Sequence, residues 1–118
     1  MTIGEVSKKY EITTDTLRYY ERIGLIPHVP RKKNGIRDFD EESCNWVSFV
    51  KCMRSAGVEI EALIEYVRLK RQDIDESRRM EILVEQREKL INKMEYLKST
   101  IERLEHKIEY YSKLSSIK

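Results

Sequence analysis

Apolar residues recur at alternating spacings of three and four along the last third of the chain, and this repeat constrains the fold more than any other feature. In an α-helix such spacings place the side chains in one stripe along one face, as in a coiled coil. We call this stripe the seam; Arg87 interrupts it, and its other members are Met80, Leu83, Leu90, Met94, Leu97, Ile101, Leu104, Ile108 and Tyr111. The seam predicts a long helix over residues 77–111, with a linker at 71–76 and a short tail at 112–118.

A helix of this length needs a partner. At about 1.5 Å per residue it is roughly 50 Å long, and a 70-residue head cannot cover a stripe along all of it. An identical chain is the simplest partner, so we predict a homodimer joined by a coiled coil. The residues that we expect to form the dimer contact are Leu83, Leu90, Met94, Leu97, Ile101, Leu104 and Ile108.

Two short capped helices are predicted at the front of the chain. Thr2 and Glu5 fit a capping box, and Thr13 or Thr14 is a second N-cap candidate. Gly24 is typical of the residue that closes a helix. Two such helices joined by a few residues form a helix-turn-helix, and residues 1–70 are the expected head of a mainly α fold.

A basic hairpin is predicted after the second helix. Pro27 and Pro30 prevent further helix, and Asn34-Gly35 favours a type I′ turn because both residues tolerate positive φ. The hairpin makes the fold a winged helix-turn-helix. Residues 1–37 hold eight Lys and Arg against four Asp and Glu, although the whole chain carries a formal charge of only +2. A basic leading third is expected where the head meets a polyanion.

Two more helices complete the predicted head. Asp40 is the expected cap of a third helix that ends near Ala56 and buries Trp46, Phe49, Val50 and Met53. A fourth helix follows at about 60–70 and begins at Glu59 without a strong capping side chain.

Several function classes find no support in the sequence. No apolar run approaches the roughly 20 residues that span a membrane, and the N-terminus lacks a secretory signal, so we expect a cytoplasmic protein without membrane partners. Cys44, Cys52, His28 and His106 have no metal-ligand spacing. We expect no disulfide, metal or other cofactor. The absence of a phosphate loop or a nucleophile–base pairing argues against an enzyme.

The second helix carries residues suited to DNA. Arg18 and Arg22 lie one turn apart, and Thr14 shares the face of Arg18. Guanidinium and hydroxyl groups bond both to phosphates and to base edges in the major groove. The simpler interpretation is a solvated helix face with an Arg–Glu pair. The adjacent tyrosines and the basic hairpin favour the DNA-binding one.

The stretch TIGEVSKKYEITTDTLRYYERIGLI resembles the opening of the MerR family of bacterial regulators, and the later elements follow in that family's order. The resemblance implies a dimer with an antiparallel coiled coil that binds and distorts double-stranded promoter DNA so that RNA polymerase can use it. It also implies DNA contacts from Arg18, from Tyr19 or Tyr20, and from Arg37 on the wing. Ile36 departs from the family, which usually has an aromatic residue there.

The effector is suggested by a cysteine. The metal-sensing members of the family resemble one another in having cysteine thiolates around the start of the dimerisation helix and in a short loop after it. This chain has Ser77 near that start and SKLSSIK at its end, without such thiolates. The stretch FVKCMRSAG resembles the NmlR/AdhR-like branch, in which a lone cysteine on the third helix is the proposed sensor of aldehydes or of nitrosative or oxidative stress. Cys52 is that candidate, with Lys51 and Arg54 expected to favour its thiolate. The alternative is an unreactive thiol, and Cys44 is expected to be structural.

A different class of function also fits the long helix. A coiled-coil scaffold or adaptor would bind proteins through its head, and the acidic segment 38–75 would suit a basic partner. Such a scaffold does not need a basic second helix followed by a basic wing. The regulator is therefore the predicted function.

Overall fold

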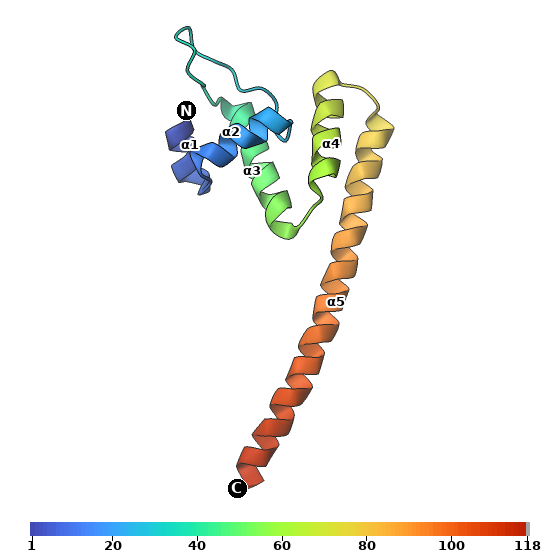
Figure 1. The fold of residues 1–118 in the computed structure, drawn as a ribbon. Coiled ribbons are helices and arrows are strands. Elements are labelled where there is room, and N and C mark those ends of the chain that lie inside the picture. Colours follow the sequence, from blue (N-terminus) through green and yellow to red (C-terminus); the bar gives the residue numbers. More distant parts are fainter. Residues whose placement is uncertain (118) are drawn as a thin grey trace. The chain divides into compact units, whose positions relative to one another are not determined.

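The chain is mainly helical in a computed structural model that describes residues 1–117. Within these residues the structure has five helices (Figure 1): α1 (Ile3–Tyr10), α2 (Thr14–Ile23), α3 (Glu41–Ala56), α4 (Ile60–Gln72) and α5 (Glu76–Ile117). The first compact unit is Met1–Gln86, which holds α1–α4 and the first turns of α5, and the second begins at Arg87. The predicted mainly α class is confirmed.

The helix boundaries of the head follow from short-range capping. Thr2 and Glu5 form the predicted capping box, in which the Thr2 hydroxyl accepts from Glu5 N at 3.1 Å and Thr2 N donates to the Glu5 carboxylate at 2.8 Å. Thr13, rather than Thr14, caps α2, because its hydroxyl accepts from Thr16 N at 3.1 Å. Asp40 caps α3 through Ser43 N at 2.8 Å. These bonds satisfy amide groups that have no partner inside the helix.

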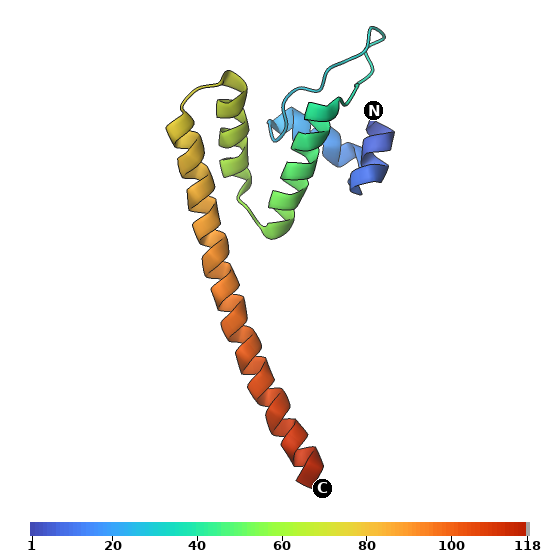
Figure 2. The same cartoon turned by 180° about the vertical axis from the view of Figure 1, so that it is seen from behind.

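The core of the first unit lies where α1 packs against α2 and α3 (Figure 2). Its fully buried side chains come from all four short helices and from the segment after α2: Val6, Leu17, Leu25, Ile26, Phe39, Val47, Val50 and Val67. Burying branched aliphatic side chains of this size contributes roughly 1.5–3 kcal/mol each.

The buried face of α3 differs from the predicted one. Val47 and Val50 are fully buried, whereas Trp46, Phe49 and Met53 are only half-buried. The two aromatic rings instead meet Tyr66 of α4, with centroids about 6 Å apart in every pair. The prediction missed Val47 because large aromatic side chains dominate a hydrophobic pattern, whereas the two fully buried side chains of α3 are both valines.

The wing is present, but its turn is not type I′. Arg31 and Arg37 form an antiparallel bridge, and Gly35 N donates to Lys32 O at 2.9 Å. Gly35 has φ +84, while Asn34 is not among the described residues with positive φ. The turn therefore needs one left-handed residue rather than two, as in a three-residue hairpin loop that ends in a glycine. Asn34 contributes its side-chain oxygen, which accepts from Ile36 N at 3.2 Å.

The start of α5 lies beside α4 in the first unit (Figures 1 and 2). Arg78 donates to the Glu65 carboxylate at 2.9 and 3.2 Å, and the buried Gln86 side chain donates to Glu59 at 3.1 Å. Ile82 is also buried on this side of α5.

Helix α5 is longer than predicted. It begins at Glu76, so the predicted linker 71–76 is helical at both ends, and it continues to Ile117. The tail predicted at 112–118 is thus helical over its described part, and Lys118 lies outside the described residues. Over residues 1–117, no helix combines the length and the apolar character that a membrane span requires.

Candidate DNA-binding surface

Helix α2 presents a polar face that includes the side chain of Arg18. The Arg18 side chain is 47% exposed and forms an ion pair with Asp15, one turn earlier, at 3.0 Å. An exposed pair of this kind contributes little to stability, at most about 1 kcal/mol, so the guanidinium is easily exchanged to another anion. Thr14, predicted to share this face, is half-buried at the first turn of α2.

The two tyrosines of α2 take different positions. Tyr19 is 41% exposed, and the Arg22 guanidinium lies over its ring at 5.3 Å from the centroid. Tyr20 is half-buried, and its carbonyl accepts from Leu25 N at 2.9 Å where the helix ends. Tyr19 is thus the more exposed of the two side chains.

A buried carboxylate joins α2 to the wing. Glu21 is 8% exposed; its Oε1 accepts from Arg37 Nε at 2.7 Å, and its Oε2 accepts from Val29 N at 2.6 Å. Burial raises the pKa of Glu21, but the hydrogen bonds from Arg37 and Val29 outweigh burial, and the pKa lies below its ordinary value. Glu21 is therefore a charged anchor that holds both ends of the wing segment.

Arginines surround this anchor. A surface hollow of about 520 Å³ is lined by Arg18, Glu21, Arg22, His28, Val29, Arg31 and Arg37. Arg31 Nη1 donates to Gly35 O at 2.8 Å, and the Arg37 side chain is 22% exposed. Because a guanidinium has five N–H donors, a bond to Glu21 still leaves donors on Arg37 for a second anion. Four arginines and one carboxylate give the hollow a positive charge that suits phosphate.

The sequence predictions included some of the residues that line this hollow. They named Arg18 and Arg37, and the structure places both in its lining. They missed Arg31, His28 and, above all, Glu21. A signal for Glu21 was present, because it follows Leu17 by four residues and so lies on the buried face of α2, where a charge requires a partner.

The two cysteines differ in exposure. Cys44 is buried, with its Sγ 4.0 Å from Phe39 O, and Cys52 is exposed on α3. The expected basic neighbours of Cys52 are engaged elsewhere. Lys51 Nζ donates to Tyr10 O, and Arg54 Nη1 donates to Val58 O at 2.7 Å. The sequence argument that these two cations favour a Cys52 thiolate is therefore not supported by their contacts.

The predicted dimerisation residues are left uncovered along α5. Leu83, Met94, Leu97, Ile101, Leu104 and Ile108 are between 43% and 66% exposed, and Leu90 is half-buried. Among residues 1–117, no group of three or more histidine, cysteine or carboxylate side chains is arranged to hold a metal ion.

A helix-turn-helix with a basic wing defines a class of sequence-specific DNA-binding proteins. A family model described as "MerR HTH family regulatory protein" matches residues 1–70, and the chain belongs to the MerR family. The regulator AdhR of Bacillus subtilis (strain 168) is 53% identical over 92 residues, which are 77% of this chain and 66% of AdhR. The compared region thus spans just under two thirds of that relative.

Solved structures agree over nearly the whole chain. A MerR family transcriptional regulator from Listeria monocytogenes is 41% identical, with a TM-score of 0.90 over 95% of this chain and 86% of that one. HiNmlR, described as a MerR family regulator lacking the sensor domain and bound to promoter DNA, is 25% identical. Its TM-score is 0.85, over 98% of this chain and 92% of that one.

Proposed function

We propose that the chain is a transcription regulator that binds double-stranded promoter DNA as a homodimer and acts by distorting it. The observation that carries this proposal is the positively charged hollow of α2 and the wing, with Arg18 on α2 and Arg37 on the wing both in its lining. Helix α2 supplies the element that enters a major groove, and the wing supplies phosphate contacts beside it. HiNmlR, which resembles the chain over almost its full length, was solved on promoter DNA.

The proposed homodimer determines how far apart the two bound DNA half-sites lie. Two heads on one two-fold axis bind two half-sites, so the distance between heads fixes the DNA length that they can span. A dimer that fits only bent or untwisted DNA pays a deformation energy that depends on sequence. By distorting the DNA between the two half-sites in this way, the protein would present a promoter to RNA polymerase.

Footprinting tests the DNA-binding proposal. The purified full-length chain should protect two half-sites related by symmetry on DNA upstream of its own gene. The matched variant Arg18→Ala should lose most of the protection at the same protein concentration. A scrambled DNA of the same length controls for non-specific binding, which salt suppresses strongly. Equal binding to both DNAs would contradict sequence-specific recognition, and binding to neither would favour the scaffold or adaptor, whose head binds protein.

We further propose Cys52 as the effector-sensing residue. It is supported by exposure, because Cys52 is exposed and Cys44 is buried, and by the 53% identity to AdhR, of the branch that the FVKCMRSAG stretch resembles. With an aldehyde, Cys52 Sγ would bond to the carbonyl carbon while the thiol proton passes to the carbonyl oxygen. The product is a hemithioacetal, and nothing is released. A shift of about 1–3 kcal/mol between two dimer states is enough for a useful switch.

Transcription in vitro tests the sensor separately from DNA binding. Wild type, Cys44→Ser and Cys52→Ser are compared with and without formaldehyde or a nitrosothiol. Cys52→Ser should bind DNA normally and lose the response, and Cys44→Ser should keep it. A full response from Cys52→Ser would show that the effector acts elsewhere.

A further inference from the structure

A second surface hollow lies between α3 and α4 and has an aromatic end. Its volume is about 230 Å³, and the residues that line it are Glu42, Asn45, Trp46, Phe49, Tyr66 and Lys70. The rings of Trp46, Phe49 and Tyr66 meet with centroids between 6.0 and 6.2 Å apart, and all three are only half-buried. Such rings offer an apolar surface on which another ring can stack. A cavity of roughly 150 Å³ holds benzene, so this hollow is large enough for a ring with a short substituent.

The side of the hollow that α3 supplies changes from polar to aromatic along the helix. Glu42 comes one turn before Trp46, and Asn45 comes one turn before Phe49. Residues one turn apart share a helix face, so the four side chains form one strip. The strip begins with a carboxylate and an amide near the start of α3 and continues with two rings.

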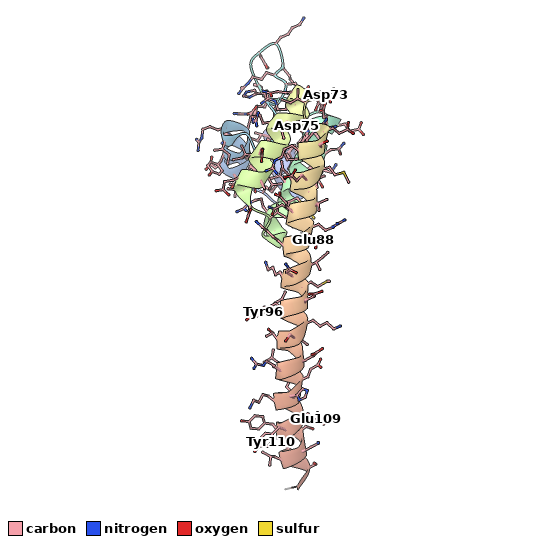
Figure 3. All side chains as sticks on the ribbon, turned by 90° about the vertical axis from the view of Figure 1, so that its right-hand side faces the viewer. Asp73, Asp75, Glu88, Tyr96, Glu109 and Tyr110 are labelled. Atoms are coloured by element: carbon pink, nitrogen blue, oxygen red, sulfur yellow. The ribbon has the colours of Figure 1, made fainter. Side chains whose placement is uncertain are left out.

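Helix α4 supplies the same two kinds of residue in the matching places. α3 and α4 run in opposite directions (Figures 1 and 2). On α4, Tyr66 comes one turn before Lys70. Asp73, the C-cap of α4, lies at the wing end of the head (Figure 3), and α3 begins directly after the wing. Lys70 therefore lies toward Glu42 and Asn45, which together make the polar end of the hollow.

The two charges of the polar end are not paired with each other. Glu42 and Lys70 are both exposed, and within residues 1–117 neither side chain forms an ion pair. Each can therefore bind a group of opposite charge on a ligand. Asn45 adds a side-chain amide, which both donates and accepts hydrogen bonds. The polar end thus presents an acceptor for a cation and donors for an anion side by side.

We propose that the hollow between α3 and α4 binds an aromatic α-amino acid or a zwitterion of the same type. Such a molecule carries an ammonium and a carboxylate on one carbon, with an aromatic ring attached through a CH₂ group. The ammonium would bind Glu42, the carboxylate would bind Lys70 and Asn45, and the ring would stack on the aromatic end. Small-molecule sites combine apolar walls with a few polar groups in this way.

This site is separate from the two described above. It shares no lining residue with the arginine-rich hollow of α2 and the wing, and Cys52 does not line it. The inference therefore depends neither on DNA binding nor on the thiol sensor. It gives the head a reversible, non-covalent ligand. Because that ligand would bridge α3 and α4 in the folded chain alone, it should also raise the thermal stability of the head.

Protein-observed NMR of the full chain tests the proposal. The sequence has one tryptophan, so the indole N–H of Trp46 gives one recognisable signal from the aromatic end. L-Phenylalanine should move this signal in a saturable way, with a dissociation constant of roughly 1 mM for a ligand of about twelve non-hydrogen atoms. Glycine, which has no ring, should leave the signal in place. The absence of a saturable shift at about 20 mM phenylalanine would overturn the proposal.

Two analogues of phenylalanine test its charges one at a time. Phenethylamine keeps the ring and the ammonium, whereas 3-phenylpropionate keeps the ring and the carboxylate. Each should bind about three- to fivefold more weakly than phenylalanine, because each lacks one exposed ion pair. An analogue that binds as tightly as phenylalanine would show a site for a single charge and would overturn the zwitterion.

Two variants test the residues assigned to each charge. Glu42→Gln should weaken phenylalanine and phenethylamine by about the same factor without weakening 3-phenylpropionate. Lys70→Gln should weaken phenylalanine and 3-phenylpropionate without weakening phenethylamine. Glu41→Gln and Arg71→Gln, at exposed neighbouring positions outside the lining, are the matched controls and should leave all three affinities unchanged. Equal effects of the controls would show that the overall charge of the head attracts the ligands, which contradicts the site.

A second copy of the chain seated on the hollow would give a different result. The Trp46 signal would then move as the protein is diluted, and phenylalanine would have no effect on it. That outcome would overturn the proposal and assign the hollow to a contact between subunits.

Discussion

The carboxylate of Glu21 on α2 accepts a hydrogen bond of 2.7 Å from Arg37 Nε on the wing. The second carboxylate oxygen accepts from Val29 N at 2.6 Å, at the start of the same segment. One buried side chain thus sets the position of the wing relative to α2, the helix that we propose enters the major groove. The residue that positions the wing and the residues that would contact phosphate are neighbours in one hollow.

Glu21→Gln should weaken both the head and its DNA binding. The amide keeps the size of the side chain but not its charge, and its single oxygen can accept only one of the two hydrogen bonds. We therefore expect a loss of about 1–3 kcal/mol in the free energy of unfolding. Urea unfolding and a DNA titration measure the two effects. Glu102→Gln, exposed on α5, is the matched control and should alter neither. Unchanged DNA affinity in Glu21→Gln would show that the wing holds its position without this anchor.

Acid should remove the contribution of Glu21. Its pKa in the folded chain is lowered from the ordinary value of 4.5, so the unfolded chain takes up the proton first as pH falls. The stabilisation is therefore complete well above pH 4.5 and declines below it, toward the lowered pKa. The difference in unfolding free energy between wild type and Glu21→Gln should shrink below pH 4.5. Comparing the two chains cancels the other acidic groups, and a constant difference would contradict the anchor's charge.

Arg18 and Arg37 should affect DNA binding in different ways. Arg18→Ala should cost about 1–3 kcal/mol and relax the preference at one base pair, as the loss of a base contact does. Arg37→Ala should weaken all sequences alike and flatten the salt dependence of binding. It should also destabilise the head, because it leaves Glu21 buried without its cation. Titrations at several salt concentrations separate these effects, and unchanged binding in both variants would contradict the surface.

Two glycines should respond in opposite ways to the same substitution. Gly24 ends α2 with φ +83, and an added Cβ would lie at an ordinary 3.9 Å from Ile64, so the cost of Gly24→Ala is one of backbone conformation. We expect a loss of about 1 kcal/mol or more. Gly4 lies inside α1, where Gly4→Ala should stabilise the chain by roughly 0.5–1 kcal/mol. Thermal unfolding of both variants decides whether conformation alone governs these positions.

Charges placed in the seam should abolish the dimer. Leu97→Asp with Leu104→Asp puts two carboxylates where apolar side chains are expected to meet, and burying them without partners is costly. Sedimentation should show a monomer or an unfolded chain. An intact dimer would mean that another surface joins the subunits.

The sequence predicted the parts of the fold that depend on near neighbours. Thr2 and Asp40 were predicted as caps, and Thr13 was one of two candidates for the third, because each bonds to an amide three residues ahead. The anchor formed by Glu21 was not, because its partner lies 16 residues away and is chosen by tertiary packing. The same limit explains Lys51, whose side chain reaches Tyr10 O at the end of α1 instead of remaining beside Cys52.

The turn of the wing shows a finer limit. Asn34-Gly35 located the hairpin, but one dipeptide is compatible with more than one turn type, and the number of loop residues decides between them. Here Lys32 N donates to Ile36 O at 2.8 Å, and this bond closes a three-residue loop whose last residue is Gly35.

The aromatic cluster of α3 and α4 provides an optical signal from one part of the chain. Trp46 is the single tryptophan of the sequence, and its ring lies 6.0 Å from Phe49 and 6.2 Å from Tyr66. Because the ring is half-buried, its emission changes when α3 and α4 separate. Tryptophan fluorescence therefore reports melting of the head, while circular dichroism at 222 nm, a wavelength sensitive to all helices, also records the 42 residues of α5. Following both signals in one titration distinguishes loss of the head from loss of helix α5.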